Sequence, residues 1–183
     1  MLIIDLNFDD VYDVHVHSSD LKTFSFESPL LTGGTTVISV LIQPARNLFL
    51  QEVLNLSFGP ENESEIDDFA RVEHLNYFKV FSTVLFCGLT YLRANQEKYL
   101  GVDGSDFRRA YLYYRTMQRN YQYLTNYFRL YGVKYYVRVL RGKDKNDMMQ
   151  IDPNEFYAVP YQIENKLLEN HKSLFNYFIF YLA

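Results

Sequence analysis

The residues best suited to chemistry lie at the start of one tyrosine-rich segment. A turn at Gly104 and Ser105 is followed by Arg108 and Arg109. A helix that begins here exposes backbone N–H groups that bind phosphate or carboxylate, and Ser105 or Asp106 is expected to cap it. The helix dipole disfavours two arginines in a first turn by about 0.3–1 kcal/mol each, so an anion is expected beside them.

Two sources of that anion stay open. It is either a phosphate of a bound ligand or a carboxylate of the acidic loop at Asp67 and Asp68. Both would neutralise the same guanidinium groups through charge-assisted hydrogen bonds. The sequence therefore predicts an anion-binding or phosphate-binding site, with an external and an internal candidate for its occupant. Its residues are Gly104, Ser105, Arg108 and Arg109.

Further arginines continue along the same segment. They and one glutamine recur at intervals of 7, 4, 3 and 7 residues, which places them on one side of a helix. The series is Arg108, Arg115, Arg119, Gln122 and Arg129. Arginines among tyrosines suit phosphate contact with base stacking, so Arg115, Arg119, Arg129 and Tyr111 are predicted to bind nucleic acid. Because the chain has 17 Tyr and no Trp, these rings also suit a helix that packs against a second subunit.

Other motifs point less strongly to a reaction. His15 and His17 imitate the strand-borne histidine pair of metal-dependent amidohydrolases, but the chain has only His74 and His171 besides them. A polar strand face is therefore favoured over a metal site. The strand, turn and helix start around Gly104 resemble the acyl-CoA-binding corner of acetyltransferases without its Gly-x-Gly/Ala pattern. No catalytic residue, metal or cofactor is predicted, and an acyl- or nucleotide-dependent transferase stays an alternative.

The elements that position these residues follow from hydrophobic periodicity. Alternating residues predict strands at 12–17, 24–27, 36–42, 52–58, 98–102, 135–140 and 155–160. Helical periodicity predicts helices over 79–95 and 106–131, the second ended by Gly132 as a C-terminal cap, and a third over 162–181. The predicted fold is α+β: an antiparallel sheet of four to six strands, two long helices packed on one face, and a C-terminal helix.

Composition limits the classes of protein to which the chain can belong. A length of 183 residues fits one domain, residues 1–183, with a core large enough to need no disulfide. A single cysteine suits a reducing compartment, and the chain shows neither a secretory signal nor a membrane-spanning run, so a cytoplasmic protein is expected. Residues 1–75 carry 13 acidic and 3 basic residues, whereas residues 76–149 carry 5 and 13. This asymmetry predicts either a face for a polyanion or complementary packing of the two parts.

A set of short motifs resembles an uncharacterised family of small bacterial proteins common in the Bacteroidetes, domain of unknown function 6934. The similarity covers residues 22–140. Its motifs are Phe24-x-Phe26-Glu27-Ser28, Asn55-Leu56-x-Phe58-Gly59, Ile66-Asp67-Asp68, Lys79-Val80, Asp103-Gly104-Ser105, Arg109 and Leu112-Tyr113. The resemblance implies a compact α+β protein without an established activity.

These observations predict a bacterial binding protein rather than an enzyme. The expected partner is nucleic acid or a phosphorylated ligand at the Arg108 to Arg129 segment, as in an accessory protein of defence or toxin–antitoxin biology. The alternative from a different class is a homo-oligomer, in which the tyrosine-rich helix packs against a second copy.

Overall fold

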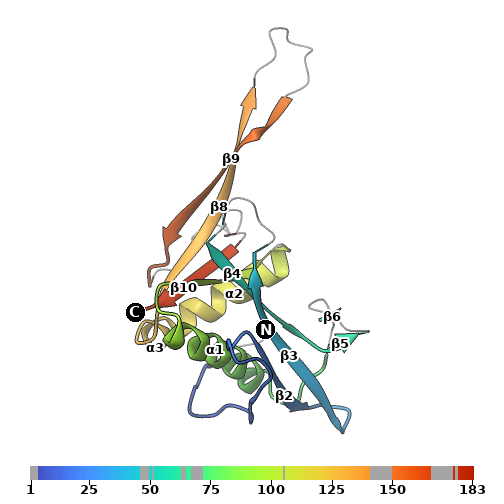
Figure 1. Cartoon of the computed structure of the whole chain (residues 1–183). Helices are drawn as coiled ribbons and strands as arrows, with labels where there is room; N and C mark the ends of the chain where they lie inside the picture. The colour runs from blue at the N-terminus through green and yellow to red at the C-terminus, as the bar shows by residue number, and fades with distance from the viewer. Residues whose placement is uncertain are drawn as a thin grey trace.

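A computed structural model shows one mixed sheet with helices on one of its faces (Figure 1). It describes residues 4–45, 50, 52–62, 65–66, 72–104, 106–140, 150–165, 175 and 177–183. For residues 61–62, 65, 107, 137–140 and 150–156 it describes the backbone alone. In this described part, the sheet has eight strands in the order β1-β2-β3-β4-β7-β10-β8-β9.

The N-terminal third is an antiparallel meander, as the alternating pattern predicts. Its strands are β1 (His15–Val16), β2 (Thr23–Pro29), β3 (Thr35–Pro44) and β4 (Val53–Gly59). Gly33 and Gly34 turn the chain between β2 and β3 with φ angles of 89° and 79°, which residues with a Cβ rarely adopt. The glycine pair therefore sets the register in which β3 returns along β2.

A helical crossover follows the meander. The short strands β5 (Glu61–Asn62) and β6 (Glu65–Ile66) pair with each other, and α1 (Tyr77–Ala94) then leads to β7 (Tyr99–Asp103), parallel to β4. The side chain of Asn76 caps α1 by accepting the N–H of Lys79. The predicted helix at 79–95 is thus confirmed, because an apolar stripe that includes Val80, Val84 and Leu92 is buried on the sheet.

The second half adds two shorter helices and three strands. These are α2 (Phe107–Arg119), α3 (Tyr121–Leu124), β8 (Phe128–Leu140), β9 (Gln150–Gln162) and β10 (Tyr177–Leu182). β10 lies between β7 and β8, antiparallel to both. The β8–β9 hairpin extends well beyond the rest of the sheet (Figure 1).

The prediction of a single helix from Asp106 to Tyr131 is wrong, because α2 ends at Arg119. The Asn120 amide then hydrogen-bonds the Thr116 carbonyl and the N-terminal segment, and Phe128 begins a strand. Gly132 is no helix cap. It lies within β8, where a Cβ would overlap the ring of Phe175.

The C-terminal helix predicted over 162–181 is also wrong in its described part, where Tyr177–Leu182 forms β10. This strand lies between two others, and Phe178 and Phe180 on one side and Ile179 on the other are all buried. A strand buried on both faces has a continuous apolar sequence without period-two alternation. Periodicity therefore could not separate it from a helix.

The predicted arrangement, an antiparallel sheet of four to six strands with two long helices and a C-terminal helix, is corrected accordingly. The sheet is mixed and larger, α2 has 13 residues and α3 has four. α1 and α2 pack on the face that carries Phe26, Ile42 and Phe180, where most of the core lies. A smaller cluster around Tyr177 and Ile179 lies on the opposite face. No described helix is long and apolar enough to cross a bilayer.

Candidate ligand cleft

The start of α2 already contains a carboxylate. Asp106 caps the helix by accepting the backbone N–H groups of Arg108 and Arg109 at 2.8 and 3.0 Å. Its second oxygen lies 3.1 Å from Nε of Arg109, whose side chain is 20% exposed. Asp106 therefore occupies the N–H groups that were predicted to bind an anion, and it orients the guanidinium of Arg109.

Of the other residues of the predicted anion site and its acidic loop, the structure describes Gly104. Gly104 lies where β7 meets α2, and a Cβ there would be 3.1 Å from the Cα of Ala110. The close approach of β7 and α2 at this point explains why residue 104 is a glycine. Ser105, Asp67 and Asp68 lie outside the described residues, so the proposed pairing of the acidic loop with the arginines is not described.

The predicted arginine series does not form one surface. Arg108 and Arg115 are exposed on α2, and Arg119 at its end pairs with Asp5 at 2.5 Å. Arg129 instead lies on β8, where its neighbours Phe128 and Leu130 face the helices and Arg129 faces the opposite side of the sheet. The fourth arginine therefore cannot share a face with the other three.

The tyrosines of the same segment are mostly packing residues. Tyr111 is half-buried, and Tyr114 is only 4% exposed. Tyr123 accepts the N–H of Phe8 with its hydroxyl at 2.8 Å, and its ring contacts those of Phe8 and Tyr127. The predicted helical interface for a second copy is thus largely directed into the protein's own core.

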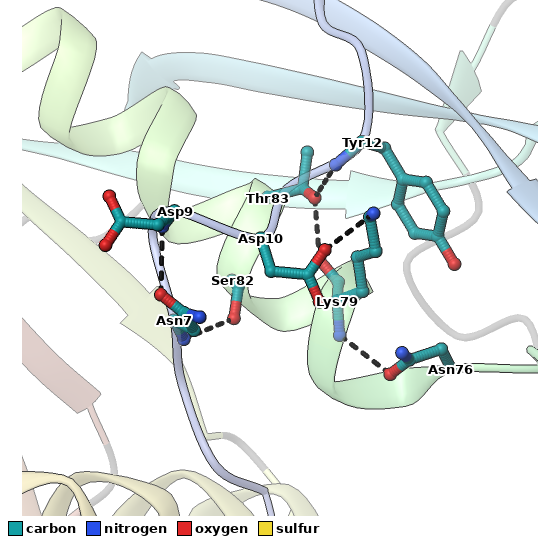
Figure 2. A network of polar contacts seen from close by, with 8 residues as sticks. All are labelled: Asn7, Asp9, Asp10, Tyr12, Asn76, Lys79, Ser82 and Thr83. Carbon is teal, nitrogen blue, oxygen red and sulfur yellow. Dashed lines mark hydrogen bonds and ion pairs between the residues drawn. The ribbon is translucent and has the colours of Figure 1, made fainter.

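A polar network fixes the N-terminal segment along α1 (Figure 2). Lys79 extends its ammonium group to Asp10 at 2.7 Å and lies 5.0 Å from the ring centre of Tyr12. The hydrogen bond with Asp10 is the main reason that the pKa of Lys79 is raised. The hydroxyls of Ser82 and Thr83 accept the backbone N–H groups of Asn7 and Tyr12.

The two ion pairs that involve this segment explain part of the charge asymmetry. Asp10 with Lys79 and Asp5 with Arg119 each join the acidic first part of the chain to its basic middle. The pKa of Asp5 is lowered chiefly by its hydrogen bond with Arg119. These contacts support complementary packing within one chain, although exposed pairs of this kind add little to stability.

The parallel strand pair offers a different kind of site. Of the paired strands in the described chain, only β4 and β7 run parallel, and they pair over three positions, the last joining Asn55 to Gly101. Beyond it, the facing edges of Leu56–Gly59 and Val102–Asp103 are not paired with each other. After β7 the chain enters α2 within four residues, whereas β5 and β6 stand between β4 and α1. Open α/β sheets bind ligands at such strand ends.

An apolar cavity of about 40 Å³ lies beneath these strand ends, between the sheet and the helices. Leu56, Phe58 and Val102 form part of its floor. Half-buried residues that line it, Phe81 and Leu85 of α1 and Tyr113 of α2, mark its mouth between the two helices. We call the cavity and the adjoining ends of β4 and β7 together the ligand cleft.

Two side chains with binding chemistry lie near this mouth. Phe78 precedes Phe81 by three residues on α1 and is 40% exposed. Arg109 precedes Tyr113 by four residues on α2. Because residues three or four apart share a side of a helix, Phe78 and Arg109 continue the two walls of the cleft toward the helix starts.

The cleft was missed at the level of sequence, although a signal for it exists. A strand, a helix of 18 residues and a second strand occur in succession from β4 to β7. A helix between two strands favours a parallel pair, because a parallel connection needs a crossover. Of the predicted residues, Arg109 lies on the side of α2 that carries the cavity residue Tyr113, whereas Arg108 shares the outer side with Arg115 and Arg129 lies on β8.

The described histidines form no metal site. His17 contacts the Ser25 hydroxyl at 2.6 Å, and His74 contacts that of Ser28 at 2.8 Å. Within the described ranges, no three His, Cys, Asp or Glu side chains are grouped to hold a metal ion. His15 lies on the short strand β1, and His17 follows directly after it.

Comparison with known proteins gives one match. The model of a family of unknown function, DUF6934, matches residues 9–150, which is most of the chain. This range contains the ligand cleft apart from Leu6 and Phe180. No curated protein and no solved structure matches significantly.

Proposed function

Because the chain belongs to DUF6934, a family of unknown function, its role has to be argued from the cleft, and we propose that it binds a phosphorylated small molecule there. The observation that carries this proposal is the apolar cavity between the sheet and the helices, lined by residues of α1, α2 and the ends of β4 and β7. A concave apolar site with few polar groups at its rim is the usual form of a small-molecule site.

The charge at the rim favours an anionic group on the ligand. Arg108 is exposed, and Arg109 is held by Asp106 on the side of α2 that carries Tyr113. Neither α1 nor α2 has an acidic residue in its first turn, and the carboxylate at the start of α2 is that of its N-cap, Asp106. A guanidinium presents several N–H donors in a fork that matches phosphate geometry. Arg108, which is exposed in the first turn of α2 on the side that also carries Arg115, is the principal phosphate contact in this proposal.

Calorimetric titration with ADP tests the proposal. We expect binding in about the micromolar range, weakened about tenfold by Arg108→Glu because the charge at the rim is reversed. Arg115→Glu is the matched control, since it changes the same charge on the same helix two turns away. Failure of the wild type to bind at about 1 mM ADP, or equal weakening by both variants, would contradict the proposal.

A second candidate function is single-stranded nucleic-acid binding along the outer side of α2. Its support is that Arg108 and Arg115 are exposed two turns apart, about 10 Å along the axis, with Arg119 one turn further. Phosphate contacts of this kind weaken steeply with salt. An oligonucleotide titrated at low and high salt against Arg115→Glu separates the two candidates, because that variant spares ADP binding and weakens nucleic-acid binding.

A further inference from the structure

We infer that single-stranded nucleic acid binds at the root of the β8–β9 hairpin, where exposed tyrosines stack on its bases while α2 contacts its phosphates. We call Tyr136, Tyr157 and Tyr161, together with Lys134, the hairpin tyrosine surface. This surface is separate from the ligand cleft. Binding there rests on the second candidate function, to which it adds contacts with the bases.

The hairpin tyrosine surface lies on the helical side of the sheet. A Cβ on Gly132 would overlap the ring of Phe175, a residue of the main core, so position 132 of β8 faces the helices. Because side chains alternate along a strand, Lys134 and Tyr136 face the same side. The β9 residues opposite Tyr136 and Gly132 share that side, and they are Tyr157 and Tyr161. The hairpin extends well beyond the rest of the sheet (Figure 1), and all three tyrosines are exposed.

The rings of this surface are held by contacts with each other and with a cation. The hydroxyls of Tyr136 and Tyr161 lie 2.9 Å apart, and the ring centres of Tyr161 and Phe175 lie 6.4 Å apart. The ammonium group of Lys134 is 5.6 Å from the ring centre of Tyr161 and 5.5 Å from that of Phe175. Rings that are ordered before binding lose less conformational entropy when a base stacks on them. Aromatic rings beside cations are typical of single-stranded nucleic-acid sites.

The neighbouring elements carry the charge that a polyanion requires. α2 contains four arginines and β8 contains three basic residues, and neither element contains an acidic residue. The amide of Gln118 on α2 donates to the carbonyl of Glu164, just after β9, at 2.7 Å, so this side of α2 borders the hairpin. Arg115 precedes Gln118 by three residues, which places it on the same side of α2, and it is exposed. One strand can therefore place its phosphates at Arg115 and its bases on the tyrosines.

A polypeptide partner fits this part of the molecule less well. The N–H of Ile163 donates to the carbonyl of Leu130, so alternate amide positions of β9 point to β8 and position 160 points outward. Pro160 has no N–H to offer there, which opposes the addition of a strand at this edge. A second copy placed on the tyrosine face by a two-fold axis would set Lys134 of each copy within the same interface, where like charges repel.

Fluorescence anisotropy with a labelled oligothymidine of about 12 nucleotides tests the inference. We expect Tyr157→Ala to weaken binding about tenfold, because a base loses its stacking partner, and Tyr157→Phe to leave it unchanged, because the ring is kept. Tyr99→Ala is the matched control. Tyr99 is 38% exposed, but it precedes the core residue Leu100 on β7 and so faces the other side of the sheet. Equal effects of the two alanine substitutions would overturn the inference.

Three further outcomes separate the inference from its alternatives. A duplex of the same length should bind more weakly, because its bases are stacked on each other, and equal affinity would contradict base stacking on tyrosine. If Arg115→Glu weakens binding and Tyr157→Ala does not, the second candidate function stands and the inference is overturned. If the wild type does not bind at about 100 μM, both fail, and the ADP titration still decides the cleft. A dimer that Tyr157→Ala converts to a monomer in sedimentation, without oligonucleotide binding, would assign the surface to a second copy instead.

Discussion

At the residue scale, Gly101 is the position least able to change. The ring of Tyr177 lies across it, and the Tyr177 hydroxyl donates to Oδ1 of Asn55 on the next strand at 3.1 Å. Burial is also the main reason that the pKa of Tyr177 is raised. This contact fixes the orientation of the Asn55 amide, whose NH₂ group is directed away from Tyr177. Asn55 stands at the last position where β4 and β7 pair. The last paired position of β4 and β7 therefore requires a residue without a Cβ at position 101.

We expect Gly101→Ala to lower the free energy of unfolding by about 1–3 kcal/mol, because the new Cβ overlaps the ring of Tyr177. Urea denaturation measures the loss. Gly88→Ala is the matched control: its Cβ would meet only side-chain ends, the nearest at 3.3 Å, and alanine favours a helix over glycine. A Gly101→Ala protein as stable as the Gly88→Ala protein would contradict this account of the contact.

His74 makes stability depend on pH. It is 7% exposed, contacts the Ser28 hydroxyl through Nδ1, and burial lowers its pKa. Below its ordinary value of about 6.5, the unfolded chain binds a proton that the folded chain resists, so stability falls as pH decreases through this range. Urea denaturation at pH 7.5 and 5.5 should show this loss, and His74→Gln should reduce it. His15→Asn, an exposed control, should keep the wild-type dependence, and equal slopes in all three proteins would refute the assignment to His74.

At the element scale, the N-terminal segment is an integral part of the helical layer. Ile4, Leu6 and Phe8 are buried, and Asn120 accepts the N–H of Leu6 while donating to the carbonyl of Ile4. The same amide donates to the Thr116 carbonyl at the end of α2. One asparagine thus ends a helix and fixes a segment that is more than 100 residues distant in sequence.

Asn120→Ala should destabilise the protein by roughly 2–4 kcal/mol, since it leaves the buried N–H of Leu6 and the carbonyl of Ile4 without their partner. Thermal unfolding measures the effect. Asn126→Ala is an exposed control in the next turn and should change stability by less than about 0.5 kcal/mol. If protease cleavage within the first ten residues is no faster in Asn120→Ala than in the control, the amide does not hold this segment.

At the scale of the whole molecule, the tyrosines divide into two populations. Most of those of α2 and α3 pack into the core, whereas Tyr136, Tyr157 and Tyr161 are 46%, 54% and 41% exposed on the β8–β9 hairpin. The hydroxyls of Tyr136 and Tyr161 lie 2.9 Å apart. Any surface for a second copy is therefore better sought on this hairpin than on α2.

The two populations should respond differently to truncation. Tyr123→Ala is expected to cost about 2–4 kcal/mol of unfolding free energy, because the ring packs against Phe8 and Tyr127 and the hydroxyl accepts a backbone N–H. Tyr157→Ala should cost less than about 0.5 kcal/mol. Chemical denaturation compares them. Similar losses would mean that the hairpin contributes to the cooperative core as much as α3 does.

The sequence by itself determined the elements whose pattern is local. The glycine turn at Gly33 and Gly34, the strands β2, β3 and β4 and the helix α1 follow from period, stop signals and capping, which need no distant partner. Family membership was also readable from short motifs, and the model match over residues 9–150 confirms it.

Only the tertiary structure decided the elements that depend on a distant partner. β8 is a strand because β10, about 50 residues away, pairs with it from Phe128 to Val133, and β10 is apolar on both sides because it lies inside the sheet. The arginines of α2 were visible in the sequence, but their partners Asp106 and Asp5 and the separation of Arg129 from them came from folding. The cleft arose in the same way, since the ends of β4 and β7 meet only once α1 has brought these strands side by side.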